Sequence, residues 1–146
     1  MIQGAIDSWI VQLYNRGMKI IADTNIFLSV ALEEESKKKI IKQSQGCDIC
    51  APEILPYEIG NALSAMIKRK QIDKAEALSI FSITQKIPVK LVKVDIPKAL
   101  SIALTHNIYA YDAYFLQCAV AASCSILSLD KKLTEVAQVM NIEVMQ

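Results

Sequence analysis

With 146 residues, a hydrophobic content of 53% and a net charge of +1, the chain fits one domain whose core needs neither disulfides nor a structural metal. Its four glycines and four prolines are scattered, and no segment is a repeat or is low in complexity, which argues against linkers and disordered tails. The longest apolar runs carry polar side chains and the amino terminus lacks a signal-peptide pattern, so we expect a cytoplasmic protein without a membrane segment.

Residues 1–17 form an N-terminal extension ahead of the first predicted strand. Its apolar residues recur at helical spacing and predict one face of an amphipathic helix. These residues are Ile2, Ile6, Trp9, Ile10, Leu13 and Tyr14. Such a helix could pack on the domain or on a second subunit; the alternative is that a misplaced start codon added the segment.

Short apolar segments alternate with helical patterns along residues 18–146, which is typical of parallel strands joined by crossover helices. Strands are predicted at 19–22, 47–51, 89–94 and 125–129, with a candidate fifth at 142–144. Helices are predicted at 24–32, 33–45, 52–70, 73–86, 97–106 and 112–122, with a short one after residue 130. Segment 126–129 lacks polar alternation, so both faces of the sheet should be covered. We therefore expect a three-layer α/β/α sandwich around a mostly parallel sheet of four to five strands.

Four acidic residues occupy positions where such a fold gathers ligands. Asp23 and Asp130 follow predicted strands, Asp112 begins a predicted helix, and Glu58 falls within the apolar face of another helix. Each aspartate taken alone is readily explained as a helix N-cap, whereas Glu58 would be costly to bury without a partner. Because ligands collect beyond the carboxyl ends of parallel strands, the four side chains are expected to converge at one edge of the sheet.

Four carboxylates in one cleft would repel one another and could not all stay ionised without a cation. Magnesium or manganese suits such a cluster, because hard divalent ions prefer oxygen ligands and leave sites open to water and phosphate. Other chemistries lack their signatures. His106 is the only histidine, and neither a nucleophile elbow nor a glycine-rich phosphate loop occurs.

The four cysteines are interpreted as core residues. Cys47 and Cys50 form a C-x-x-C pair, but Cys118 and Cys124 have the wrong spacing to complete a zinc site. Withdrawing four carboxylates from a net charge of +1 leaves +5 on the remaining chain, which favours a polyanion modestly. The basic clusters are at 37–39, 68–70 and 131–132, although each alone is readily explained as a solvated helix face.

These motifs resemble those of the PIN-domain family, and within it the toxin ribonucleases of VapBC-type toxin–antitoxin pairs. The resemblance covers residues 18–146 and rests on four segments whose order and separation are more specific than any one of them. The segments are Ile20–Asn25, Ala51–Leu63, Tyr111–Leu116 and Leu127–Leu133.

The resemblance implies that Asp23, Glu58, Asp112 and Asp130 form a catalytic metal site. It implies that Thr24 or Asn25 shapes the first of these positions and that Ser128 is the hydroxyl residue found two positions before the last acid. It also implies hydrolysis of single-stranded or looped RNA, homodimerisation, and inhibition by an antitoxin.

Three alternatives remain open at this point. The domain could be a PIN-like RNA-binding or assembly module with weak catalysis, or a housekeeping RNA-processing nuclease. A response-regulator-like α/β domain is the third, but it requires a phosphoacceptor on a middle strand, where the chain offers only Asp95. Metal-dependent RNA cleavage separates the catalytic readings from the others.

Overall fold

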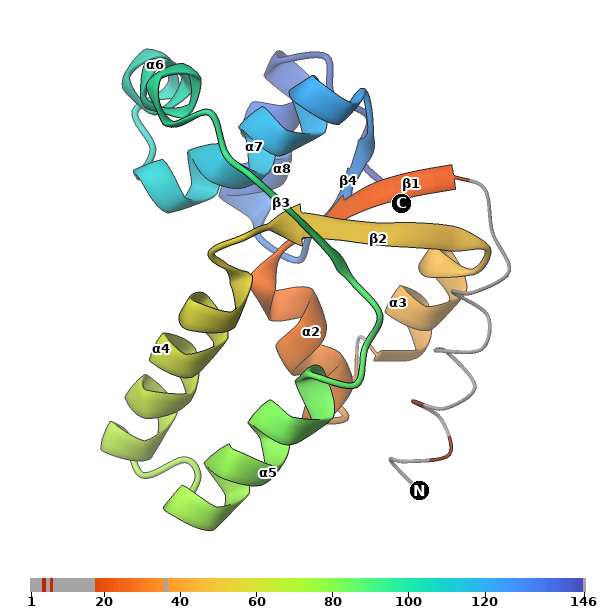
Figure 1. Cartoon of the computed structure of the whole chain (residues 1–146), viewed down its shortest axis with the longest axis vertical. Helices are drawn as coiled ribbons and strands as arrows, with labels where there is room; N and C mark the ends of the chain where they lie inside the picture. Colours follow the sequence, from red (N-terminus) through yellow and green to blue (C-terminus); the bar gives the residue numbers. More distant parts are fainter. Residues whose placement is uncertain (1–3, 5, 7–17, 36, 146) are drawn as a thin grey trace.

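The computed structural model describes Gly4, Ile6 and residues 18–35 and 37–145. The described strands are β1 (Met18–Ala22), β2 (Cys47–Pro52), β3 (Lys90–Val92) and β4 (Ser125–Leu127). The described helices are α2 (Thr24–Ala31), α3 (Lys37–Ser44), α4 (Leu55–Lys68), α5 (Lys74–Thr84), α6 (Ile96–His106), α7 (Ala110–Ala122) and α8 (Lys131–Val139). Figure 1 shows them on the two sides of one sheet.

The four strands form a parallel sheet in the order β3-β2-β1-β4. Strands β1, β2 and β3 follow one another across the sheet, whereas β4 lies on the opposite side of β1. The direction of winding therefore reverses between β1 and β4, and the crevice beyond their carboxyl ends is the expected ligand-binding position.

Successive side chains of a strand point to opposite faces of its sheet, so neighbouring β1 side chains pack in different cores. Ile20 and Ala22 join the core formed with α2, α3, α4 and α5, whereas Ile21 joins the core formed with α7 and α8. Figure 1 shows the same division, with α7 and α8 on one side of the sheet and α2 to α5 on the other. The three-layer α/β/α sandwich with a parallel sheet is confirmed.

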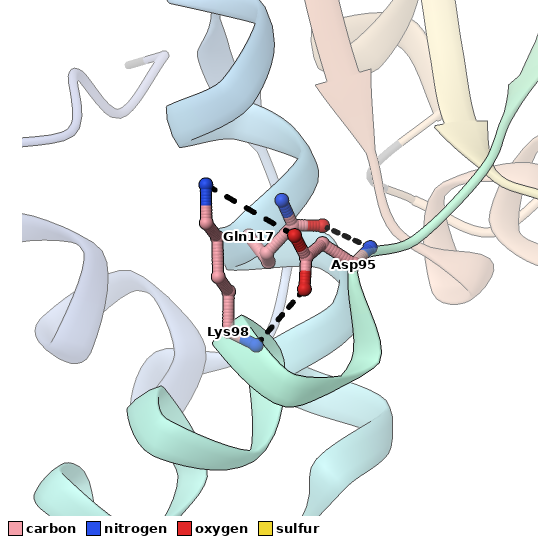
Figure 2. A network of polar contacts seen from close by, with 3 residues as sticks. All are labelled: Asp95, Lys98 and Gln117. Carbon is pink, nitrogen blue, oxygen red and sulfur yellow. Dashed lines mark hydrogen bonds and ion pairs between the residues drawn. The ribbon is translucent and has the colours of Figure 1, made fainter.

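Helix α6 lies against α7 and begins at a polar network. Asp95 caps α6 by accepting a hydrogen bond from Lys98 N at 3.1 Å, and its own backbone N–H donates to Gln117 Oε1 of α7 at 3.0 Å. The Lys98 ammonium lies 4.0 Å from the Asp95 carboxylate (Figure 2). Because Gln117 is buried, this network fixes the start of α6 against the middle of α7.

Several predicted boundaries need correction. The sequence predicts that Pro52 opens a helix, but Pro52 ends strand β2. The next residue, Glu53, donates its backbone N–H to Val92 O at 2.8 Å, so the pairing of β2 with β3 does not need the N–H that proline lacks. The helix predicted from residue 33 begins instead at Lys37, because Glu33 adopts a left-handed backbone with φ 56° after α2. The candidate fifth strand is reduced to one parallel bridge between Ile126 and Val144.

The amphipathic helix predicted over residues 1–17 falls largely outside the described residues. Ile6, which is described, is fully buried in the core that contains α2 to α5. None of the helices in the described part of the chain is long and apolar enough to span a membrane.

We predict that Phe27→Ala lowers the free energy of unfolding by about 3–5 kcal/mol, because the ring is fully buried and its removal leaves a cavity in the core of α2. Leu104→Ala is the matched control, since Leu104 is 83% exposed and should change stability by less than about 0.5 kcal/mol. Urea unfolding followed by circular dichroism measures both. Equal effects of the two substitutions would contradict the described core.

Candidate metal centre at the sheet edge

Asp23 stands at the carboxyl end of β1, where the winding of the sheet reverses. Its backbone N–H donates to Leu127 O of β4 at 3.2 Å, and its Oδ1 caps α2 by accepting from Ile26 N at 3.3 Å. Its Oδ2 accepts a hydrogen bond from the Ser128 hydroxyl. The side chain is therefore held in one orientation by α2 and by the segment that follows β4. Asp23 is buried, with only 5% of its surface exposed.

Asp130 follows β4 and is tied to Asp23 through Ser128. The Ser128 Oγ accepts from Asp130 N at 2.9 Å while its hydroxyl proton goes to Asp23. Asp130 Oδ1 caps α8 by accepting from Leu133 N at 3.0 Å. Both aspartates thus serve as helix caps and still lie at the same edge of the sheet.

Glu58 lies in the first turn of α4 and is contacted by the first residue of α2. Thr24 Oγ1 donates to Glu58 Oε2 at 2.7 Å. The other oxygen, Oε1, is buried without a hydrogen-bond partner among the described residues. The resemblance implied that Thr24 or Asn25 shapes the position of Asp23, and the structure shows in addition that the Thr24 hydroxyl orients Glu58.

Asp112 lies in the first turn of α7 and is not its N-cap, because the helix begins at Ala110 with Tyr109 in the capping position. The positive end of the helix dipole still favours a carboxylate at this point. The sequence-based start of the helix was therefore wrong by two residues, although the acid remains at its amino-terminal end.

One cavity of about 310 Å³ brings the acidic residues together. Its lining includes Asp23, Glu58, Asp112 and Asp130, as well as Thr24 and Asn25. Ser128 acts from behind this lining through its contact with Asp23. All of the sequence-predicted site residues therefore lie in or directly beside one cavity.

Burial is the main cause of the raised pKa values in this cavity. It raises the pKa of Asp23 to about 6, against the lowering effects of the hydrogen bonds from Ser128 and Ile26, and the charges of Asp130 and Asp112 raise it further. Burial likewise raises the pKa of Glu58, and the charge of Asp112 raises it further. Burial also raises the pKa of Asp112, and the charge of Asp130 adds to that increase. The carboxylates therefore interact electrostatically, and the ion pairs found among residues 18–35 and 37–145 involve none of the four.

No group of three or more His, Cys, Asp or Glu side chains within residues 18–35 and 37–145 is arranged as a ready metal cage. The oxygen-only donor set and the unpaired Glu58 Oε1 nevertheless fit magnesium or manganese. Magnesium commonly takes only one or two carboxylates and completes its coordination with water and substrate phosphate, so a complete protein cage is not required. The residues that could hold it are Asp23, Glu58, Asp112 and Asp130.

A zinc site at the C-x-x-C pair is incompatible with the strand. Cys47 and Cys50 are three residues apart in β2, and they therefore face different cores of the sandwich. All four cysteines are buried, in agreement with their interpretation as core residues.

Three further residues with polar groups line the cavity, and the sequence predicted no role for them. They are Tyr57, Asn61 and Tyr111. Helical spacing could have indicated Asn61, which lies three residues after Glu58 and so on the same face of the helix. Tyr57 and Tyr111 each directly precede an acid, a spacing that does not place two side chains on one helical face.

We predict that metal-free Asp23→Asn is more stable than the parent protein by about 1–3 kcal/mol above pH 6, and that this difference vanishes below about pH 4. The pKa of Asp23 is about 6 in the fold, whereas its ordinary value is 3.8, so between these two pH values the unfolded chain releases the proton first. The parent protein therefore loses stability as pH rises through this window, whereas asparagine stays neutral.

Urea unfolding in EDTA from pH 3.5 to 8 measures the difference in stability between the two proteins. A parent protein that is the more stable of the two at neutral pH would contradict the assigned cost of ionising Asp23.

Comparison with known proteins places the fold and this edge of the sheet in context. PAE2754 from Pyrobaculum aerophilum is similar with a TM-score of 0.63 and 20% identity, over 82% of this chain and 86% of that chain. VapBC2 from Rickettsia felis, solved with a DNA fragment from their promoter, is similar with a TM-score of 0.59 and 14% identity, over 87% of this chain and 97% of that chain. A search of curated proteins found no significant match. The family model described as PIN domain matches residues 20–139, and the chain therefore belongs to the PIN domain family.

Proposed function

We propose that this protein is a magnesium- or manganese-dependent endoribonuclease, and that it is the toxin of a VapBC-type toxin–antitoxin pair. PIN domains are nucleases, so membership of the family supports hydrolysis of phosphodiester bonds. The metal, the RNA substrate and the toxin role are the proposed parts.

The observation that carries the proposal is the meeting of four acids from distant segments in one cavity. Asp23, Glu58, Asp112 and Asp130 all line it, although 107 positions separate the first from the last. Glu58 Oε1 has no hydrogen-bond partner in the described part of the chain, and burial raises the pKa of Asp23, of Glu58 and of Asp112. Such a cluster is costly for a protein to maintain unless a cation neutralises it.

The chain's own residues orient the acids before any substrate arrives. Ser128 and Ile26 N fix Asp23, Ser128 also holds the backbone of Asp130, and Thr24 fixes one oxygen of Glu58. These contacts leave the unpaired Glu58 oxygen as an acceptor for a cation. Divalent ions bound there would activate an attacking water and neutralise charge on the phosphodiester.

Charge outside the cavity supports an RNA substrate. The net charge is +1 with the four acids included, so the remaining chain carries +5. Lys131 and Lys132 are exposed directly after Asp130, at the start of α8. In contrast, Lys37 is buried and pairs with Glu33 at 2.9 Å, so the basic cluster at 37–39 offers fewer free charges than the sequence implied.

The toxin role is supported by the likeness to the VapBC2 structure from Rickettsia felis. An antitoxin partner and a homodimer are part of the same proposal. A housekeeping RNA-processing nuclease would use the same site without an inhibitor. A small reading frame beside the gene whose product binds and inhibits this chain would support the toxin role.

We predict that Asp112→Asn reduces kcat on single-stranded RNA by at least about 100-fold in magnesium or manganese, because it removes one charge from the cation-binding set. Asp73→Asn is the matched control, since Asp73 is an exposed cap of α5 outside the cavity and asparagine also caps helices. Cleavage of a labelled oligoribonucleotide measures both variants.

EDTA should abolish cleavage, and added manganese should restore it only in the parent and Asp73→Asn proteins. Undiminished cleavage by purified Asp112→Asn, or activity that survives EDTA, would refute the proposed metal site.

We also predict that Ser128→Ala lowers metal affinity or kcat by about 10- to 100-fold, because the residue orients a metal-binding carboxylate without lining the cavity itself. Its hydroxyl contacts Asp23 and its oxygen accepts from Asp130 N, so both acids lose one restraint. Ser79→Ala on the exposed side of α5 is the control. Manganese titrations and cleavage rates should show the loss only for Ser128→Ala; equal values for the two variants would argue against the positioning role.

A further inference from the structure

A second hollow of about 480 Å³ adjoins the carboxylate cavity. The two share Ile54, Tyr57 and Tyr111, so a ligand that occupies one can continue into the other. The volume of the hollow lies within the range of small-ligand sites in proteins. Val94 and Ile96 also line it, and they flank Asp95 of the network in Figure 2.

The tyrosines between the two hollows are sequence neighbours of the acids. Tyr57 precedes Glu58 on α4, and Tyr111 precedes Asp112 on α7. Successive helical residues differ in direction by about 100°. Each of these two helices therefore contributes an acid and, beside it, an aromatic ring that reaches the adjoining hollow.

Both rings are accessible. Tyr57 is 76% exposed and Tyr111 is 57% exposed, although aromatic rings of this size are usually more buried. Tyr111 also contacts Tyr114 edge to face, with ring centroids 5.7 Å apart and an interplanar angle of 88°. This contact supports one side of the Tyr111 ring, whereas the Tyr57 ring makes no contact with another ring in the described part of the chain.

The lining of the second hollow favours a neutral planar group over a phosphate. Among the described residues, Glu53 is the one charged residue that lines it, and none of the basic ones does. A phosphate would be repelled there, whereas a nucleobase can stack on tyrosine and place polar edges against Glu53 or the tyrosine hydroxyls. Because the two hollows share three lining residues, a phosphodiester at the carboxylates would place its neighbouring base beside the second hollow.

We propose that the second hollow binds a nucleobase of single-stranded RNA that flanks the cleaved phosphodiester, with Tyr57 and Tyr111 as the stacking residues. This inference rests on the proposed ribonuclease function and names its substrate-binding subsite. Stacking of this kind tolerates any base but requires an unpaired one, because bases inside an RNA duplex are already stacked. The subsite therefore selects single-stranded over double-stranded RNA.

The test measures RNA binding and cleavage separately. Tyr57→Ala and Tyr111→Ala, each combined with Asp112→Asn to prevent cleavage, are titrated with a fluorescein-labelled single-stranded oligoribonucleotide and with its duplex. Tyr109→Ala is the matched control, since Tyr109 lies two residues before Tyr111 and is 85% exposed but lines neither hollow. Tyr57→Phe and Tyr111→Phe keep the ring, and circular dichroism verifies the fold of every variant.

Each alanine variant should raise Kd for the single strand about 5- to 100-fold, and the same variants with Asp112 intact should raise KM by a similar factor. The phenylalanine variants and Tyr109→Ala should stay within about twofold of the parent, as should all variants with the duplex. Kd values that do not change for Tyr57→Ala and Tyr111→Ala, in a protein that does cleave RNA, would overturn the subsite and leave the ribonuclease function intact.

Two further results separate the inference from the proposed function. Single-strand binding that depends on both tyrosines, in a parent protein that cleaves no RNA in magnesium or manganese, would support the subsite and contradict the ribonuclease. An alanine effect seen equally with the duplex would overturn stacking on an unpaired base.

Discussion

Repulsion among buried carboxylates is the constraint around which the functional edge of the sheet is organised. Asp23 is almost fully buried, and the charges of Asp130 and Asp112 add to the cost of ionising it. The fold retains this cost because β1, β4, α4 and α7 all present an acid to the same cavity. A protein selected for stability alone would gain by replacing such a cluster with neutral side chains.

The hydrogen bonds around the acids explain how they stay in place despite that repulsion. Asp23 and Asp130 each cap a helix, so the backbone amides of α2 and α8 stabilise the carboxylates that the cavity gathers. Ser128 connects the two aspartates, because its hydroxyl donates to the Asp23 side chain and its oxygen accepts from the backbone N–H of Asp130. One residue can therefore both cap a helix and bind a cation. From the sequence these two roles stand as alternatives, because spacing alone cannot show which oxygen remains available.

Much of the fold and the membership of the acidic set could be predicted from sequence. Apolar strands followed by acids indicate a parallel sheet with ligands at its carboxyl edge, and the four acids do line one cavity there. The ends of helices and strands were less predictable. Pro52, for example, can end a strand because the N–H of the next residue, Glu53, makes the hydrogen bond to the neighbouring strand. The contact of Thr24 with Glu58 depends on how α2 and α4 pack together, which periodicity does not reveal.

The aromatic residues illustrate the same limit. Tyr57 and Tyr111 stand beside acids in the sequence, but only the arrangement of α4 and α7 shows that both rings border one hollow. An exposed tyrosine such as Tyr109 is similar in sequence context and lines neither hollow. Three-dimensional placement, rather than residue type, distinguishes a binding surface from an ordinary exposed ring.

The central claim is that the four acids act together on one cation-binding site, and locating the ion tests it most directly. Crystals grown with manganese and measured near its absorption edge would reveal the ion by anomalous scattering. The account predicts an anomalous peak in the cavity, within coordination distance of oxygens from Asp23 and at least one other acid of the set. Well-ordered crystals with manganese bound elsewhere, and none in this cavity at saturating concentration, would contradict it.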